Sequence, residues 1–200
     1  MNHCKVFCFI LVLLAALVFG LFSSHAGAAS QPSTPWSLIG FTSIYTPDRL
    51  KDIFTNRHSY QDSYLAALAL NYRFARPSRS LGWEWEVQGV RHFGRQNHFE
   101  TNALILARWY RFPWNDWVAT TFAVGEGLSY AFRKPRLEGK DHDDPSQLLN
   151  YLLFELTLSP EEQSRWYFST RIHHRSGVFG LYNGVRGGSN FIGMGVGYRF

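Results

Sequence analysis

Apolar and polar side chains alternate with a period of two along most of the chain after its first thirty or so residues. In GWEWEVQG, residues 82–89, tryptophan and valine alternate with glutamate and glutamine. Because successive side chains of a β-strand point to opposite faces, such segments predict strands with one apolar and one polar face. The pattern predicts eight strands, at 36–46, 64–74, 82–91, 101–112, 117–132, 148–158, 166–176 and 190–200. The inward face of 101–112 stays ambiguous.

The lengths of these strands and of their connections predict a membrane barrel. A tilted strand needs roughly ten residues to cross a bilayer. The connections 47–63, 92–100, 133–147 and 177–189 are long, whereas 75–81, 113–116 and 159–165 are short. Long loops at one end and short turns at the other are typical of bacterial outer-membrane barrels. We therefore expect an all-β fold, an eight-stranded antiparallel up-and-down outer-membrane β-barrel. Side chains fill the interior of so small a barrel, which disfavours a channel.

The N-terminal segment has the features of an export signal. Lys5 precedes an apolar run from Val6 to Phe22, and the small residues 26–28 fit an A-x-A cleavage site. We expect residues 1–28 to be a signal peptide and residues 29–200 to be a single transmembrane β-barrel domain. A membrane anchor is the less favoured alternative, because the run is slightly short and has no positive flank.

Composition agrees with an exported protein of the outer membrane. Both cysteines, Cys4 and Cys8, lie in the predicted signal peptide, so the mature chain has neither a thiol nor a disulfide. The net charge is +5, but the basic residues are dispersed, so we expect no nucleic-acid partner. Aromatic residues make up 17% of the chain, which fits the aromatic girdles of membrane barrels.

Strand 166–176 divides a cluster of polar residues between its two faces. One face begins apolar with Trp166 and ends with His174 and Ser176. The other face comprises Tyr167, Ser169, Arg171, His173 and Arg175. We expect this basic face to point into the lumen, where Glu84, Glu86 and Glu155 would neutralise it.

His174 and Ser176 are then predicted to point outward at the extracellular end of the wall. Their Cα atoms should lie about 6.6 Å apart, which lets an imidazole and a hydroxyl meet. That is the minimum geometry for a base that activates a nucleophile. A polar patch at the level of the lipid headgroups is the alternative interpretation.

The chain from His173 to Phe200 resembles the lipid A 3-O-deacylase (PagL-type) family of outer-membrane esterases. The shared features are the H-x-S element on the penultimate strand, the Gly-rich loop after it and the last strand ending in Phe200. This family hydrolyses the ester-linked acyl chain at position 3 of lipid A with a Ser-His-Glu triad on the outer wall. The resemblance implies that Ser176 is the nucleophile, that His174 is the general base, and that lipid A of the outer leaflet is the partner. It implies no cofactor and no metal.

Two positions depart from the pattern of the family. The place of its glutamate falls on Asn190, which has outward parity and can orient His174 but supplies no negative charge. Gly177 follows the serine where the family has asparagine, so only a backbone N–H could serve the oxyanion there. These departures predict a weakened or absent activity. Arg175 and Arg186 are further candidates, as contacts to lipid A phosphates.

Other polar clusters are expected to have structural roles. Glu84 and Glu86 are paired carboxylates, but they should form lumenal ion pairs. The loop KDHDDP, residues 140–145, is expected to be solvated, and binding a divalent cation that bridges lipopolysaccharide phosphates is the less favoured alternative. His92 and His98 have no metal-ligating company in the sequence, so no metal site is predicted there. Glu126 is expected in a bulge or above the lipid zone, and it is the nearest spare acid if Asn190 proves inadequate.

A non-enzymatic barrel, structural or adhesive, is the alternative to the esterase. In that case the His-x-Ser motif persists only as part of the scaffold. The sequence leaves the oligomeric state open, including a homodimer.

Overall fold

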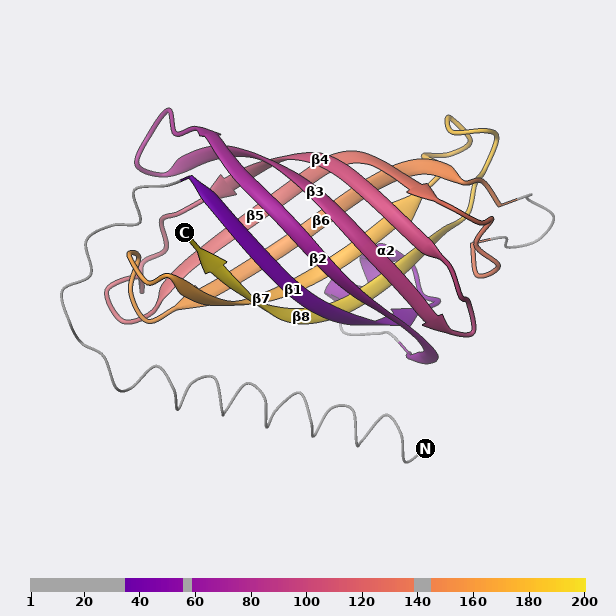
Figure 1. Ribbon diagram of the computed structural model, residues 1–200, viewed down its shortest axis with the longest axis horizontal. Coiled ribbons are helices and arrows are strands. Elements are labelled where there is room, and N and C mark those ends of the chain that lie inside the picture. The colour runs from indigo at the N-terminus through magenta and orange to yellow at the C-terminus, as the bar shows by residue number, and fades with distance from the viewer. Residues whose placement is uncertain (1–34, 56–58, 139–144) are drawn as a thin grey trace. The chain divides into compact units, whose positions relative to one another are not determined.

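The chain forms a closed barrel of eight antiparallel strands, as the sequence pattern predicts (Figure 1). The computed structural model describes residues 35–55, 59–138 and 145–200. The strands are β1 (Trp36–Thr46), β2 (Gln61–Ala75), β3 (Leu81–Gly94), β4 (Phe99–Trp109), β5 (Ala119–Ala131), β6 (Leu148–Ser159), β7 (Trp166–Ser176) and β8 (Gly188–Arg199). Each strand pairs with its neighbours in sequence, and β8 closes the barrel against β1. The predicted signal peptide, and all of the loop 140–145 except its last residue, lie outside the described residues.

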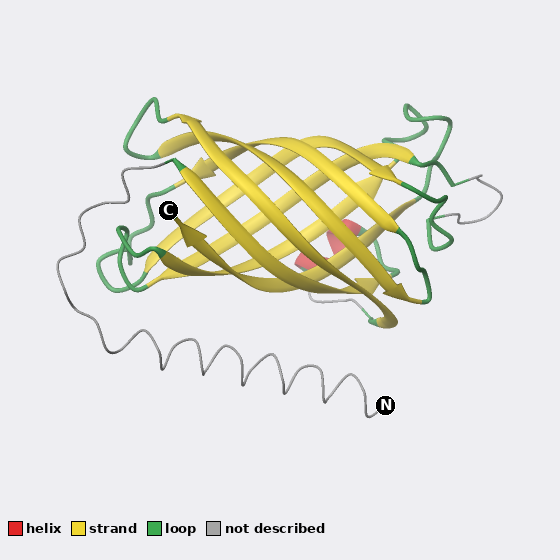
Figure 2. Ribbon diagram, viewed as in Figure 1, coloured by secondary structure: helices red, strands yellow, loops and turns green. Residues whose placement is uncertain are grey.

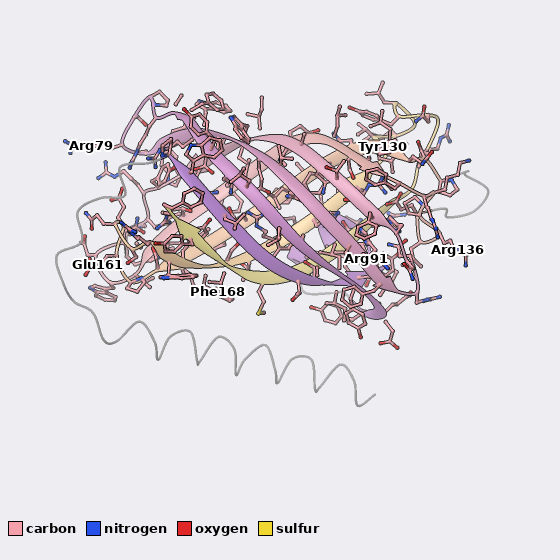
Figure 3. All side chains as sticks on the ribbon, viewed as in Figure 1. Arg79, Arg91, Tyr130, Arg136, Glu161 and Phe168 are labelled. Carbon is pink, nitrogen blue, oxygen red and sulfur yellow. The ribbon has the colours of Figure 1, made fainter. Side chains whose placement is uncertain are left out.

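The short connections and the ends of the barrel domain lie at one end, here called the turn end. Phe200 N–H donates to the carbonyl of Trp36, which joins the residue after β8 to the start of β1. Figure 3 places Arg79 and Glu161 at the turn end and Arg136 at the opposite end, here called the loop end. The loop end carries the connections 47–60, 95–98, 132–147 and 177–187.

The predicted alternation of long and short connections is wrong for one hairpin. Strands β3 and β4 extend to Gly94 and from Phe99, so residues 95–98 make a tight connection instead of a long loop. Gly94 adopts φ 93°, a left-handed conformation that suits glycine at a sharp turn. At the turn end, residues 110–118 form a longer connection than expected.

One short helix, α2 (Leu50–Phe54), interrupts the connection between β1 and β2, and the strand pattern did not predict it (Figure 2). The ring of its Phe54 contacts the ring of Phe154 on β6 edge-on, with centroids 5.2 Å apart. Phe154 points outward from the barrel. The connection therefore passes outside the wall to reach β6. No helix in the described part of the chain has the length and apolar character to cross a membrane.

The barrel has the polarity expected of a protein that faces lipid. Large apolar side chains are exposed along the outer wall, among them Leu68 at 60%, Ile105 at 54% and Trp166 at 49%. Buried polar residues occupy the alternate positions, which point into the lumen. Parity also resolves β4, where Leu104, Leu106 and Arg108 point inward. Such an inverted distribution is stable in a bilayer and costly in water.

An ion network crosses the lumen. The Arg171 guanidinium donates to both oxygens of Glu86 at 2.8 and 2.9 Å and to Glu155 at 2.9 Å. Arg108 binds the second oxygen of Glu155 at 2.6 Å and both oxygens of Glu84. The predicted neutralisation of the basic lumenal face by these glutamates is therefore confirmed for Arg171.

Different carboxylates neutralise the rest of that face. Arg175 binds Glu138, and the Nε2 atom of His173 lies 3.1 Å from Glu100. Glu138 comes from the connection after β5, which folds into the lumen. Burial raises the pKa of this carboxyl group, while the charge of Arg175 acts in the opposite direction.

Glycines on the inward face of β8 make room for bulky partners. A Cβ atom on Gly197 would lie 2.1 Å from the ring of Tyr167, whose hydroxyl donates to Ser37 Oγ at 3.2 Å. Glycine at this position lets β7, β8 and β1 close tightly around the lumen.

Candidate functional site on the outer wall

His174 and Ser176 point outward at the loop end, as strand parity predicts. Ser176 is the last residue of β7 and lies opposite Asn150 of β6 and Gly188 of β8. Both side chains are half-buried, whereas the lumenal neighbours His173 and Arg175 are fully buried.

Asn190 lies directly opposite His174 in the β7–β8 ladder, and their side chains are hydrogen-bonded. His174 Nδ1 is 2.6 Å from Asn190 Oδ1. The amide nitrogen of Asn190 donates to the carbonyl of Asp48 at 2.7 Å. Asp48 belongs to the connection that contains α2. This connection therefore fixes the orientation of the amide beside the imidazole.

Ser176 and His174 are adjacent but not hydrogen-bonded, since none of the bonds among the described residues joins Ser176 Oγ to the imidazole. Such bonds often form only when a substrate is in place. The backbone N–H of Gly177 donates to the carbonyl of Gly187 at 3.2 Å. In this conformation the Gly177 hydrogen closes the loop, and its role as an oxyanion donor stays a prediction.

The two arginines proposed as phosphate contacts lie in different environments. Arg175 is 1% exposed, and its guanidinium binds Glu138 and the carbonyl of Gln147. The expectation that Arg175 binds a lipid phosphate is therefore wrong, and its strand parity explains why. Arg186 is exposed on the connection after β7.

Asn150 and Glu126 extend the polar site across β6 and β5. Asn150 Nδ2 donates to Glu126 Oε1 and to the carbonyl of Gly127. Glu126 is exposed on the outer wall, and the register is regular there, so the expected bulge is absent at this residue. Sequence reasoning missed Asn150, although it is a polar residue at an outward position just above the apolar run Leu152, Phe154 and Leu156.

Apolar side chains border this polar row. Phe54 of α2 covers Phe154, one outward position further down β6 than Leu152, which lies opposite His174. On the connection after β7, Phe179 is 97% and Leu181 is 77% exposed. Val178 and Phe179 adopt φ 48° and 57°, a strained left-handed conformation immediately beyond the Ser176–Gly177 pair. An acyl chain bound near Ser176 would therefore have apolar side chains available to contact, from α2 and β6 and from the connection after β7.

The prediction that no other metal-ligating side chain lies near His92 is wrong. The carboxylate of Glu100 and the imidazole of His173 lie beside it in the lumen. His98 stacks on the His92 ring, with centroids 4.3 Å apart. Three different strands supply His92, Glu100 and His173, so their meeting was hidden in the sequence.

Comparisons with known proteins establish the fold. No protein-family model matches the sequence, and no curated protein matches it. The barrel is similar to the crystal structure of the outer-membrane enzyme PagL, with 10% identity and a TM-score of 0.60 over 82% of this chain and 99% of that one. It is also similar to Neisserial surface protein A (NspA), with 13% identity and a TM-score of 0.50 over 82% of this chain and 96% of that one. The chain therefore has the fold of the small outer-membrane barrels.

Proposed function

We propose that this protein is an outer-membrane esterase that removes an ester-linked acyl chain from lipid A. Ser176 is the nucleophile, His174 is the general base and Asn190 orients the imidazole. The observation that carries the proposal is the His174–Asn190 hydrogen bond beside Ser176 on the outer wall. A substrate that diffuses laterally in the outer leaflet can reach that wall without entering the lumen.

The outer wall supports placement in a membrane. Its exposed apolar residues would contact acyl chains, and the barrel fold is shared with outer-membrane proteins. The loop end would then face the outer leaflet, where lipopolysaccharide is the partner. Arg186 on that end is a candidate contact to a lipid A phosphate.

The hydrogen bonds around Asn190 select the tautomer of His174 that a general base requires. Because the Asn190 amide nitrogen donates to Asp48, its Oδ1 atom is the one that faces the imidazole, and an amide oxygen only accepts. His174 Nδ1 must therefore carry the hydrogen. The Nε2 atom keeps its lone pair and can take the proton of Ser176.

Hydrolysis would proceed through an acyl-enzyme. Ser176 Oγ attacks the ester carbonyl carbon while its proton passes to His174 Nε2, and the resulting imidazolium then protonates the departing sugar oxygen. Water, deprotonated by His174, attacks the acyl-serine and releases a fatty acid. Asn190 steadies the imidazolium only through its dipole. Glu126, an outward carboxylate on β5, lies two strands away, about 10 Å between backbones.

Asn150 is our proposed source of an oxyanion donor. The Asn150 amide lies directly opposite Ser176 across the β6–β7 ladder. Its nitrogen donates to Glu126 and, at 3.4 Å, to the carbonyl of Gly127, and it would exchange this longer bond for one to an oxyanion formed at Ser176. The asparagine amide that donates to the oxyanion would thus come from the neighbouring strand and not from the residue after the serine.

Mass spectrometry of lipid A tests the function. A Gram-negative host that expresses the protein should produce lipid A lacking one hydroxyacyl chain, and a host that expresses Ser176→Ala should not. Ser80→Ala at the turn end is the matched control and should behave as the wild type. Identical spectra for wild type and Ser176→Ala, with both proteins folded in the outer membrane, would reject the esterase. A non-enzymatic structural or adhesive barrel would then be the better interpretation.

Removing the Asn190 side chain tests its orienting role. We expect Asn190→Ala to lower kcat about 10–100-fold with little change in KM, because the imidazole loses its fixed tautomer while substrate contacts remain. Asn190→Asp should recover most of the rate, since a carboxylate oxygen also accepts from Nδ1. Steady-state kinetics on purified lipopolysaccharide measures both. Equal kcat for wild type and Asn190→Ala would rule out this role.

A further inference from the structure

A buried cluster in the lumen brings together two histidines and one carboxylate. His92 of β3, Glu100 of β4 and His173 of β7 are 1%, 2% and 0% exposed. His92 Nε2 lies 2.9 Å from Glu100 Oε2, and His173 Nε2 lies 3.1 Å from Glu100 Oε1. One nitrogen or oxygen from each residue lies within 4.8 Å of the others. From this geometry we propose that the lumen contains a Zn²⁺ site whose ligands are His92 Nε2, His173 Nε2 and the Glu100 carboxylate.

The contact between His173 and Glu100 is not an ordinary hydrogen bond. Both His173 Nε2 and Glu100 Oε1 are buried and have no hydrogen-bond partner among the described residues, although they are only 3.1 Å apart. The direction from this nitrogen to the oxygen therefore departs from that of an N–H···O hydrogen bond. Two ligands of one tetrahedral metal ion show this relation, because each points at the ion and they lie about 3.3 Å apart. A cation between these atoms would satisfy both.

Each ligand histidine has a partner at its other ring nitrogen. Tyr151 Oη lies 3.1 Å from His173 Nδ1, and the amide of Gln96 lies 3.5 Å from His92 Nδ1. Gln96 Oε1 is buried without a partner, and rotating the amide would let it accept from His92 Nδ1–H. Partners that accept from Nδ1–H leave the Nε2 lone pair for a metal, as around metal-ligating histidines generally. At His92 the metal would replace the hydrogen bond between Nε2 and Glu100 Oε2.

The local charge favours a cation. Glu100 and Glu138 contribute two negative charges to this part of the lumen, and Arg175 contributes one positive charge. Arg175 lies 3.7 Å from Glu100 but directs its Nη1 atom to Glu138. With neutral imidazoles the cluster is therefore net negative. Two imidazoles and one carboxylate suit Zn²⁺ better than Mg²⁺ or Ca²⁺, which prefer oxygen ligands.

The site is separate from the proposed esterase site. Its ligands point into the lumen, whereas His174 and Ser176 point to the outer wall. A zinc ion would join β3, β4 and β7, so its expected effect is on the stability of the barrel. The proposal therefore stands or falls independently of lipid A hydrolysis.

Metal analysis of the folded protein tests the proposal. Because the cluster is closed to solvent, the full chain, without a polyhistidine tag, is refolded from urea into detergent with Zn²⁺, and excess metal is then removed. Elemental analysis should find about one Zn²⁺ per folded chain. Refolding the wild type with Co²⁺ should give the visible absorption of tetrahedral cobalt. This measurement tests the site without the need for a variant.

Two lumenal variants distinguish this site from adventitious binding. Glu100→Gln should lose the zinc and the cobalt absorption, and removing metal should not lower its thermal midpoint further. Glu84→Gln, which alters a lumenal carboxylate bound to Arg108, should keep both. A wild-type protein that is folded but holds fewer than about 0.1 Zn²⁺ per chain would overturn the site, as would equal zinc in wild type and Glu100→Gln.

Discussion

His174→Ala is expected to lower kcat for ester hydrolysis by at least about 10³-fold. Without the imidazole, Ser176 loses the base proposed to take its proton, and Asn190 loses the ring that it orients. The change leaves the lumenal network intact, because His174 points to the outer wall. Release of fatty acid from purified lipopolysaccharide, measured with detergent-solubilised protein, gives the rate. In the wild type this rate should fall in acid, as the imidazole takes up a proton and ceases to act as a base.

Ile172→Ala is the matched control for His174→Ala. Ile172 is the next outward residue down the same strand, and its loss removes apolar contact without removing chemistry. We expect its rate to stay within about threefold of the wild type. If His174→Ala retained more than about a tenth of the activity, the base would lie elsewhere. Glu126 would then be the residue to test next.

Strand parity predicted most of the barrel because one choice fixes every side chain of a strand. Once the basic face of β7 was assigned to the lumen, Arg171 and His173 had to point inward and His174 outward, as the structure shows. The same rule should have removed Arg175 from the phosphate contacts. The error came from judging Arg175 by its closeness in sequence to Ser176 and not by its face.

The ends of the strands were harder to predict, because polar lumenal residues resemble loop residues. Glu100 is fully buried in β4, yet it stands among polar neighbours that read as a connection. Its carboxylate meets His173 across the lumen, although β4 and β7 are not adjacent in the sheet. Such a meeting depends on the stagger of the closed barrel. Periodicity in a single strand carries no information about it.

Register limited the prediction of the candidate site in the same way. The family resemblance, counted back from the C-terminus, together with parity placed Asn190 beside His174, and the structure has them hydrogen-bonded. Asn150 was missed because its position opposite Ser176 depends on how β6 slides against β7. The α2 connection was missed because five helical residues are too few to show a period.

Arg171→Met is expected to destabilise the folded barrel by about 3–5 kcal/mol. Arg171 is 1% exposed and neutralises Glu86 and Glu155 at once. Methionine fills much of the volume but leaves Glu86 without a cation and Glu155 with Arg108 alone. Urea unfolding from phospholipid vesicles, followed by tryptophan fluorescence, measures the loss. Lowering the pH should reduce the difference in unfolding free energy between wild type and Arg171→Met, because protonation neutralises the carboxylate that has lost its partner.

We expect Arg171→Met to be destabilising because Arg171 is buried and not because an ion pair is lost as such. Arg76→Met, which removes an exposed ion pair, separates the effect of burial from the effect of losing a pair. Arg76 pairs with Glu162 at 2.9 Å, but the two side chains are 33% and 58% exposed at the turn end. Water solvates Glu162 once its partner is gone, so we expect a loss below about 1 kcal/mol. In the lumen no solvent replaces the guanidinium, and the charge on Glu86 persists in a medium of low polarity. Equal losses for the two variants would mean that water reaches Glu86, and the filled lumen on which the proposed zinc site depends would have to be reconsidered.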